Sequence, residues 1–359
     1  MKINCHGSKI SNALAAVQSI APSSPIMPIL SNVLIKYKDN NLYFITTDLE
    51  IRIVYKLDVD VEAEENEDKE IIVPAKKFND IMTELINDEI AIDINNNHLN
   101  IKSNNSKLKL LCSAATDFPK AMKLKDSQKI TLSQEKLKNM LQSVIHCTQR
   151  DSSIYSGVLM DVKQDELRFV ATEGSKLGIA YVKQNHEKES KIVIPPKIIF
   201  ELIRNLTAGE VEIYFNSNKI QFKFNDIIIS SVLMQNSFPG YENFTPKEID
   251  NKLIINKEEF SIALKKVGLF TEKNSLSIKF EITKDKIKIS KTTADLGSAI
   301  DEVNAVWDRN LTISFNYKFL LDALHAVKGK TLKLELIGTN KPMVLRENGF
   351  IFIMLPIQD

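Results

Sequence analysis

The sequence predicts an α+β fold of three tandem repeats, each with two helices packed on an antiparallel sheet. Two repeated segments within the sequence support this prediction. The segment 71–92 has the pattern of strand, proline, helix and strand, and nearly the same segment returns from Lys191, about 120 residues later. The Phe-Pro pairs that begin at Phe118 and Phe238 recur at the same spacing. A more diverged strand–helix–strand copy begins at Ile313, so the repeat runs through most of the chain.

Each repeat opens with an amphipathic helix. The three helices are predicted to begin at Ser8, Ser133 and Asn256, whose side chains suit the N-cap position. In the second of them, apolar residues between Leu137 and Ile145 recur at the i, i+3, i+4 and i+7 spacing of one buried face. The helix inside each strand–helix–strand segment is the second helix of its repeat.

Short strands fill the rest of each repeat. Asparagine tolerates left-handed backbone geometry, so the Asn-rich stretches 95–97 and 216–218 are predicted to form hairpin turns. Polar connectors are predicted to separate the repeats. The expected domains are therefore 1–127, 128–249 and 250–359.

The composition limits the class of protein. Hydrophobic residues make up 43% of the 359 residues, which suffices for packed cores. No run of about 18 apolar residues occurs, so no membrane span is expected. The three cysteines have no metal-ligand spacing and are interpreted as reduced, which suits a cytoplasmic protein. Because the net charge is only +1, any nucleic-acid-binding surface must concentrate its positive charge on one face.

The sequence contains no recognisable catalytic set. The five histidines show no paired ligand spacing and are interpreted as ordinary surface or core residues. Phosphate-binding glycine loops and the G-x-S-x-G nucleophile turn are absent from the sequence. The acidic run 61–70 has the composition of a solvated charge cluster. We therefore expect no catalytic residue, no metal and no cofactor, and a structural or binding role is favoured over an enzyme built from tandem repeats.

Five segments that span all three repeats carry a family resemblance. They are "SPIMPILSNVLIKYKDNNLYFITTDLEI", "SGVLMDVKQDELRFVATEGSKLGIAY", "NSFPGYENFTP", "NKPMVLRENGF" and "FIFIMLPIQD". In their order and spacing, the chain resembles the bacterial DNA sliding clamps, the β subunits of DNA polymerase III.

The resemblance implies the DNA clamp fold and a closed ring. Two chains are expected to join head to tail as a homodimer around duplex DNA, with the helices of every domain lining the hole. Such a clamp binds DNA without sequence preference, has no reaction of its own, and tethers the replicative polymerase for processive synthesis. The implied partners are double-stranded DNA, the DNA polymerase III alpha subunit, the clamp loader, which opens the ring with ATP, and other polymerases and repair proteins with a clamp-binding motif.

Positive side chains on the helices are the candidate DNA contacts, because phosphate contacts attract DNA independently of sequence. Lys76 and Lys197 stand at equivalent repeat positions, and Lys197 also matches a DNA-contacting position of the family. Ser24 stands where the family often has a basic residue, so that loop is expected to offer DNA no more than a hydroxyl hydrogen bond. The candidate set is Lys76, Lys77, Lys136, Lys138, Gln149, Arg150, Lys197, Arg204, Lys265, Lys266 and Lys318.

The resemblance also implies a peptide-binding cleft. The chain is apolar almost to its last residue, although chain ends usually fray unless they are docked. In the family, the C-terminal residues and two loops, here "TEGSKL" and "FPGYENF", form a hydrophobic cleft that captures short motifs of partner proteins. Ser175 and Asn243 stand where the family more often has His or Arg, so partner preference is expected to differ. The candidate set is Tyr155, Thr172, Gly174, Ser175, Leu177, Pro239, Asn243, Phe244, Ile353, Leu355, Pro356 and Ile357.

A second interpretation remains open, namely a monomeric scaffold that binds peptides and does not encircle DNA. The net charge near zero favours this alternative, and the clustering of the candidate cations on the predicted helices argues against it. In a head-to-tail dimer, the interface is expected at the start of the first domain and the end of the third. The segment from Lys279 is a candidate edge strand for that interface.

Overall fold

The structure is a computed structural model of the chain. It describes residues 2–24, 26–38, 41–58, 61–62, 69–95, 98–104, 106–121, 123–149, 155–250 and 252–358. The chain divides into two compact units. Unit 1 comprises Met1–Glu135 and Arg204–Leu233, and unit 2 comprises Lys136–Ile203 and Met234–Asp359.

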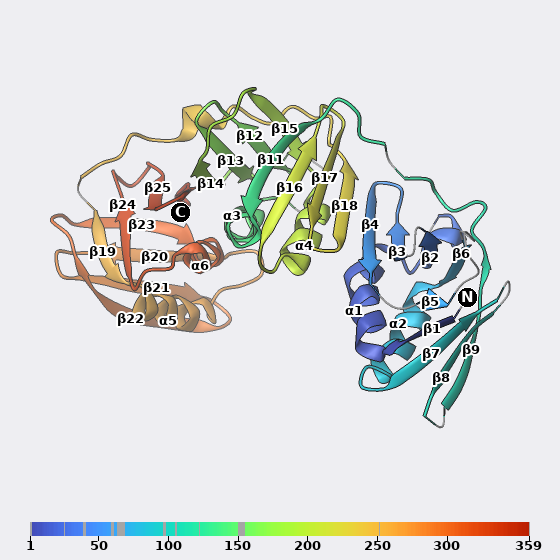
Figure 1. Cartoon of the computed structure of the whole chain (residues 1–359). Coiled ribbons are helices and arrows are strands. Elements are labelled where there is room, and N and C mark those ends of the chain that lie inside the picture. The colour runs from blue at the N-terminus through green and yellow to red at the C-terminus, as the bar shows by residue number, and fades with distance from the viewer. Residues whose placement is uncertain are drawn as a thin grey trace. The chain divides into compact units, whose positions relative to one another are not determined.

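Unit 1 contains two antiparallel sheets (Figure 1). The five-stranded sheet has the order β5-β1-β7-β8-β9, and the nine-stranded sheet has the order β10-β6-β2-β3-β4-β18-β17-β16-β11. Because β4 pairs with β18, strands of the first and second repeats share one sheet. The elements are β1 (Lys2–His6), α1 (Gly7–Val17), η1 (Gln18–Ile20), η2 (Pro28–Ser31), β2 (Asn32–Lys38), β3 (Asn41–Thr47), β4 (Ile51–Leu57), β5 (Val61–Glu62), β6 (Lys69–Pro74), α2 (Ala75–Glu84), β7 (Glu89–Ile94), β8 (His98–Ser103), β9 (Ser106–Leu111), β10 (Ser113–Ala114), β11 (Gln128–Ser133), β16 (Glu210–Phe215), β17 (Lys219–Phe224) and β18 (Ile227–Val232).

Unit 2 contains a twelve-stranded sheet of order β15-β12-β13-β14-β26-β25-β24-β19-β22-β21-β20-β23. Here β14 pairs with β26, so strands of the second and third repeats are joined in the same way. The remaining elements are α3 (Gln134–Ile145), β12 (Val158–Val162), β13 (Glu166–Thr172), β14 (Lys176–Lys183), β15 (Ser190–Ile194), α4 (Pro196–Asn205), η3 (Tyr241–Phe244), β19 (Leu253–Asn256), α5 (Lys257–Gly268), β20 (Ser277–Ile282), β21 (Lys286–Thr293), β22 (Gly297–Val306), β23 (Leu311–Asn316), α6 (Tyr317–Ala326), β24 (Thr331–Glu335), β25 (Met343–Glu347) and β26 (Phe350–Met354).

The repeat seen in the sequence is a repeat of structure. The strand–helix–strand segments are β6-α2-β7, β15-α4-β16 and β23-α6-β24, and each repeat also contributes one opening helix, α1, α3 or α5. Within unit 1 the helices α1 and α2 pack side by side, and α5 and α6 do the same in unit 2 (Figure 1). The α+β prediction of two helices and antiparallel strands in each repeat is confirmed.

The helix starts were predicted with mixed success. Asn256 caps α5 and accepts hydrogen bonds from the backbone N–H groups two and three residues later, 3.0 and 3.2 Å away. Ser133 directly precedes α3. The prediction for Ser8 is wrong, because α1 already begins at Gly7 and its N-cap is His6. The ring nitrogen Nδ1 of His6 accepts a hydrogen bond from the backbone N–H of Ser8 at 3.4 Å.

Both Asn-rich stretches lie between paired strands. Strands β16 and β17 form the predicted hairpin, in which Asn216 Oδ1 accepts from two following backbone N–H groups at 2.9 and 3.0 Å. Strands β7 and β8 pair in the same way, and Asn95 Oδ1 accepts from the backbone N–H of His98 at 3.0 Å. Residues 96–97 lie outside the described part of the chain.

The expected edge strand at Lys279 is not an edge. It lies in β20, which pairs with β21 on one side and with β23 on the other. Its charged residues occupy the solvent face of an inner strand, where Glu281 contacts Lys279 and Lys288 at 2.9 Å each. Among the described residues, strands with an unpaired edge include β9 and residues 297–304 of β22, which pairs with β19 only at its last two residues.

Candidate functional site

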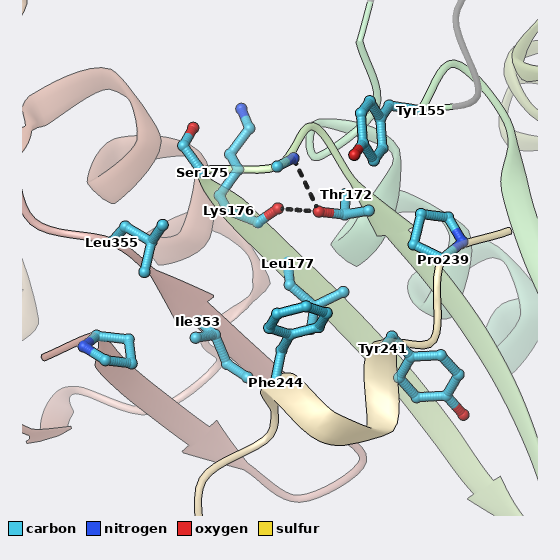
Figure 2. Close-up of a pocket in the computed structure, with 12 residues that line it drawn as sticks. Tyr155, Thr172, Ser175, Lys176, Leu177, Pro239, Tyr241, Phe244, Ile353 and Leu355 are labelled. Carbon is cyan, nitrogen blue, oxygen red and sulfur yellow. Dashed lines mark hydrogen bonds between the residues drawn. The ribbon is translucent and has the colours of Figure 1, made fainter.

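A cavity of about 300 Å³ opens on unit 2 beside the β14–β26 pair (Figure 2). Its walls come from the loop between β13 and β14, from η3, and from the end of β26. It is lined by Tyr155, Thr172, Gly174, Ser175, Lys176, Leu177, Pro239, Tyr241, Phe244, Pro342, Ile353 and Leu355.

The floor of the cavity is apolar because two adjacent strands turn hydrophobic side chains toward it. Leu177 on β14 and Ile353 on β26 are cross-strand partners and are 6% and 5% exposed. Both belong to the apolar cluster that covers this part of the sheet. Beyond β26, the backbone N–H of Leu355 donates to the carbonyl of Ser175 at 2.9 Å. The C-terminal segment is therefore docked on the cleft rather than frayed.

A threonine shapes the loop that forms one wall. The Thr172 hydroxyl donates to the carbonyl of Lys176 at 2.7 Å and accepts from the backbone N–H of Gly174 at 3.1 Å. Gly174 has φ +96°, a left-handed conformation that favours glycine. These bonds fix the tight turn that presents Ser175 and Lys176 to the cavity.

The first repeat contains the same turn. The Thr47 hydroxyl donates to the carbonyl of Ile51 at 2.8 Å and accepts from the backbone N–H of Leu49 at 3.1 Å. Leu49 also has a positive φ of 81°. In place of an open floor, this repeat has Arg52, which is 7% exposed and donates to the carbonyl of Pro119 at 2.7 Å. A guanidinium thus occupies the position that Leu177 holds in the second repeat.

The rim of the cavity exposes apolar side chains. Phe244 is 65% exposed and Leu355 is 49% exposed, and Figure 2 shows both beside the cavity. Large exposed apolar side chains around a concave, apolar site are typical of a surface that binds another molecule. The cleft is therefore suited to bind a ligand by burying apolar surface, with few polar contacts.

Among the described residues, one cation lines the cleft. Lys176 is only 5% exposed, and its Nζ lies 3.7 Å from the ring centroid of Phe319 and 3.6 Å from Glu173 Oε2. Burial, together with the charge of Lys176, lowers the pKa of the nearby His146 to about 4. Burial also raises the pKa of Cys147, so this thiol stays protonated. Although His146 Nδ1 is 3.5 Å from Cys147 Sγ, a buried neutral thiol is not a nucleophile.

The cavity contains nine of the twelve residues predicted for the cleft. The three that do not line it are Asn243, Pro356 and Ile357. Asn243 is an exposed residue of η3. Ile357 instead forms a β-bridge with Ser314, to which its backbone N–H donates at 2.8 Å. Strand alternation accounts for Pro356, which directly follows the lining residue Leu355 and so faces the other way.

Three lining residues were missed, namely Lys176, Tyr241 and Pro342. Lys176 lies between the predicted cleft residues Ser175 and Leu177, two residues after the positive φ of Gly174. Pro342 lies within the quoted segment "NKPMVLRENGF", so that segment was the available signal.

Nine of the eleven candidate DNA-contacting residues lie on the five helices α2 to α6. Arg150 is outside the described residues, and Gln149 follows α3, where its backbone N–H donates to Tyr155 O at 3.0 Å. Arg204 donates to Ala16 O at 3.2 Å and to Ser19 Oγ at 2.5 Å. Lys138 is half-buried. The exposed members of the set are Lys76, Lys77, Lys136, Lys197, Arg204, Lys265, Lys266 and Lys318.

The described residues contain no group of three or more His, Cys, Asp or Glu side chains that could hold a metal ion. Among the helices of that same part of the chain, none combines the length and the apolarity that a membrane crossing requires.

Three family models match consecutive parts of the chain. They describe the N-terminal domain of the DNA polymerase III beta subunit at residues 1–123, its central domain at 131–240 and its C-terminal domain at 242–350. The chain belongs to the family of bacterial DNA sliding clamps. The resemblance inferred from the sequence is thereby confirmed.

Individual sliding clamps are similar over almost the whole chain. The beta sliding clamp of Pseudomonas putida is 28% identical over 344 residues, which cover 94% of this chain and 93% of the relative. A Bartonella birtlesii sliding clamp bound to griselimycin is 26% identical with a TM-score of 0.92, and the match covers all of both chains. A Pseudomonas aeruginosa sliding clamp bound to griselimycin has a TM-score of 0.94 over all of both chains and, at 24% identity, supports the clamp fold.

Proposed function

We propose that two copies of this chain close head to tail into a ring around duplex DNA and tether the replicative polymerase. The observation that carries the proposal is that unpaired strand edges include β9 in the first repeat and residues 297–304 of β22 in the third. An open edge offers unpaired N–H and C=O groups to a strand of another chain. Two different edges on one chain permit head-to-tail pairing, and two such contacts close a dimer.

The side chains of the two edges support this pairing. Leu111 on β9 is 73% exposed and Ile300 on β22 is 63% exposed, which is typical of side chains that a partner covers. Strand β9 also carries the exposed Lys107 and Lys109. Strand β22 carries Glu302, whose carboxylate is also contacted by Lys286 at 2.9 Å. The two edges thus differ in the sign of their charge, which favours pairing between unlike edges.

Lysines at one recurring helix position support DNA binding. Lys76, Lys197 and Lys318 are each the second residue of a helix, α2, α4 and α6, and all three are exposed. In a dimer this position would supply six positive charges on the helices, although the net charge of each chain is only +1. Phosphate contacts of this kind are independent of sequence and allow sliding.

Absolute mass in solution tests the ring. Light scattering across a dilution series is expected to give twice the 40.7 kDa of one chain. A stable single-chain mass at every concentration would contradict the proposal and favour the monomeric peptide-binding scaffold, which the net charge near zero also favours.

Charge reversal at the recurring lysines is expected to weaken DNA retention. Lys76→Glu with Lys197→Glu should shorten the lifetime of the loaded clamp on DNA by about tenfold at low salt, since each lost phosphate contact lowers the affinity and the salt dependence. The matched control is Lys102→Glu with Lys223→Glu, two exposed lysines on strands β8 and β17. The lifetimes are measured by single-molecule fluorescence. Equal lifetimes for the two double variants would show that the helix lysines do not contact DNA.

We further propose that the cleft on unit 2 binds short apolar segments of the DNA polymerase III alpha subunit, the clamp loader and other DNA-processing proteins. The apolar floor and the exposed Phe244 and Leu355 support this assignment. Griselimycin, the ligand named for two related sliding clamps, serves as a small probe for this chain. The proposed clamp has no reaction of its own and acts in the cytoplasm. Its proposed domains are 1–127, 128–249 and 250–359.

Loss of the Thr172 hydroxyl is expected to weaken ligand binding. It should lower the stability of the fold no more than loss of the equivalent Thr47 hydroxyl. Thr172→Val frees the loop at Gly174 and should raise the Kd for griselimycin about fivefold, because one buried hydrogen bond contributes about 1 kcal/mol. Thr47→Val removes the same two bonds from the first repeat and is the matched control. Calorimetry should find unchanged affinity in the control and a similar fall in melting temperature in both. Equal affinities of Thr172→Val and Thr47→Val for griselimycin would show that the Thr172 turn does not contribute to binding.

A further inference from the structure

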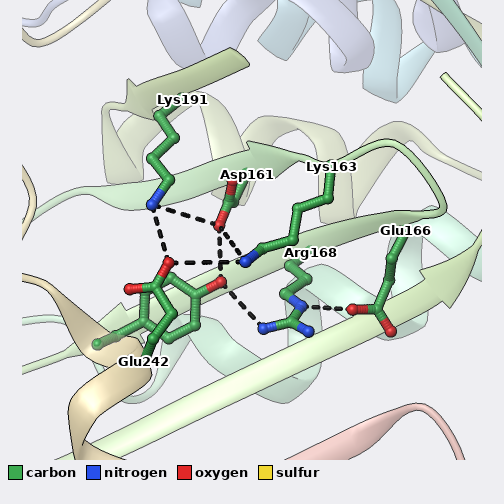
Figure 3. Close-up of polar contacts among 7 residues, drawn as sticks. Asp161, Lys163, Glu166, Arg168, Lys191 and Glu242 are labelled. Carbon is green, nitrogen blue, oxygen red and sulfur yellow. Dashed lines mark hydrogen bonds and ion pairs between the residues drawn. The ribbon is translucent and has the colours of Figure 1, made fainter. Parts of the chain in front are cut away.

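A polar cluster lies next to η3 on the side of the sheet shown in Figure 3. Its formal charges cancel, since three carboxylates face three cations. The cluster consists of Asp161, Lys163, Glu166, Arg168, Lys191, Tyr241 and Glu242. Asp161 is only 1% exposed, and a buried carboxylate is costly unless it is paired and hydrogen-bonded. The residues that pair with or donate hydrogen bonds to Asp161 are therefore held in place.

Tyr241 is the residue that satisfies Asp161 at short range. Its hydroxyl donates to Asp161 Oδ2 at 2.7 Å and accepts from Arg168 Nη1 at 3.2 Å. The guanidinium of Arg168 is itself paired with Glu166. Burial and the hydrogen bond to Asp161 raise the pKa of Tyr241, so the phenol keeps the proton that it donates. The tyrosine is thus fixed from both sides.

Glu242 supplies a second link to the same cluster. Lys191 Nζ lies 2.9 Å from Glu242 Oε1 and 3.8 Å from Asp161 Oδ2. Lys163 Nζ lies 3.6 Å from Glu242 Oε1 and 3.8 Å from Asp161 Oδ2. Both lysines therefore bridge the η3 residue to the buried carboxylate on β12.

The short helix η3 has little stability of its own. It is a four-residue 3-10 helix without a side-chain hydrogen bond at its N-cap, and the backbone bond from Thr245 N to Glu242 O is 3.3 Å long. Short 3-10 turns have poor hydrogen-bond geometry. Its first two residues, Tyr241 and Glu242, join the polar cluster, while its last, Phe244, forms the cleft wall (Figures 2 and 3). The position of Phe244 thus depends on the cluster.

We propose that Tyr241 and Asp161 are positioning residues of the cleft, whose hydrogen bond holds η3 so that Phe244 stands as a preformed wall for the bound peptide. The ring of Tyr241 packs in the same apolar cluster as Leu177 and Ile353, so its hydroxyl end serves the polar network and its ring serves the floor. The inference rests on the proposed peptide-binding function. Asp161 acts on the ligand only through η3, whereas the ring of Tyr241 also lines the cavity.

The test uses the full-length chain and griselimycin as the probe, with affinity measured by calorimetry. Tyr241→Phe keeps the ring and should raise the Kd about tenfold, since a hydrogen bond to a charged group contributes about 1.5–3 kcal/mol. Asp161→Leu should act similarly. Asp161→Asn keeps an acceptor for the phenol and should restore the affinity to within about twofold of the wild type, since the Tyr241 bond persists. Lys191→Met, a change at a 57% exposed side chain, should weaken binding about threefold by freeing Glu242.

The control is Tyr214→Phe, which removes a comparable tyrosine–carboxylate bond, 3.1 Å to Glu212, in unit 1. Hydrogen exchange of the amides of residues 241–245 gives a second readout that needs no ligand. Faster exchange in Tyr241→Phe and Asp161→Leu, but not in Asp161→Asn or Tyr214→Phe, supports the inference. Wild-type affinity and exchange in Tyr241→Phe overturn it. Absence of griselimycin binding to the wild type would instead contradict the proposed cleft function, and the exchange data would still decide whether the cluster holds η3.

Discussion

Truncation of Phe244 and Leu355 together to alanine is expected to weaken binding of griselimycin and of the DNA polymerase III alpha subunit by roughly 100-fold or more. These side chains are 65% and 49% exposed in the chain, so a ligand seated in the cleft covers apolar surface that the variant lacks. Burial of such side chains contributes about 1.5–3 kcal/mol each, and every 1.4 kcal/mol is about tenfold in affinity.

Exposed side chains can be removed without opening a cavity in the core, so the melting temperature of this double variant should stay near that of the wild type. The matched control is Phe200→Ala, a phenylalanine that is 57% exposed on α4 and outside the cleft. Surface plasmon resonance should find wild-type affinity in the control. Equal affinity in the double variant and the control would show that the cleft is not the binding site.

Placing carboxylates on both proposed edges is expected to abolish the dimer. Leu111→Asp with Ile300→Asp introduces a charge into each half of an interface that occurs twice in the ring, and desolvation of an unpaired charge costs several kcal/mol. The dimer Kd should rise by roughly 1,000-fold or more, because every 1.4 kcal/mol is about tenfold. Sedimentation equilibrium gives this constant directly.

Leu49→Asp with Ile337→Asp is the control for the edge variant. These residues are 50% and 47% exposed and, like the edge pair, come one from each unit. The control should remain dimeric. A dimer that survives in the edge variant, or dissociation in both, would mean that β9 and β22 are not the joined strands.

The repeat and its elements could be predicted from the sequence because local chemistry decides them. The strand–helix–strand segments are marked by apolar periodicity, and the Asn256 cap and the Asn216 turn depend on side chains a few residues from the groups they bond. The prediction of Ser8 as an N-cap was wrong because His6, one residue before the helix, also has a side-chain acceptor and takes the N-cap position.

Long-range pairing could not be predicted in the same way. The alternating charges from Lys279 suit an edge strand and the solvent face of an inner strand equally well, and only the partners β21 and β23 decide between them. The pairs β4–β18 and β14–β26 likewise join residues far apart in the sequence, so the two compact units cut across the three repeats.

The candidate cleft was predicted in part for the same reason. Leu177, Ile353 and Leu355 belong to apolar family segments that the sequence displays. Asp161 and Arg168 lie in the same quoted segment as Leu177, but the resemblance assigns them no role. A buried carboxylate on β12 becomes recognisable only once Tyr241 is seen to reach it.

The most direct test of the ring is the dependence of retention on DNA topology. The chain is loaded by a clamp loader and ATP onto a nicked circular plasmid, the complex is separated from free protein, and half of it is cut at a single site. We expect long retention on the circle and rapid loss through the free ends after cutting, because a closed ring is linked to the DNA rather than tightly bound. Equal retention on circular and cut DNA would contradict a closed ring.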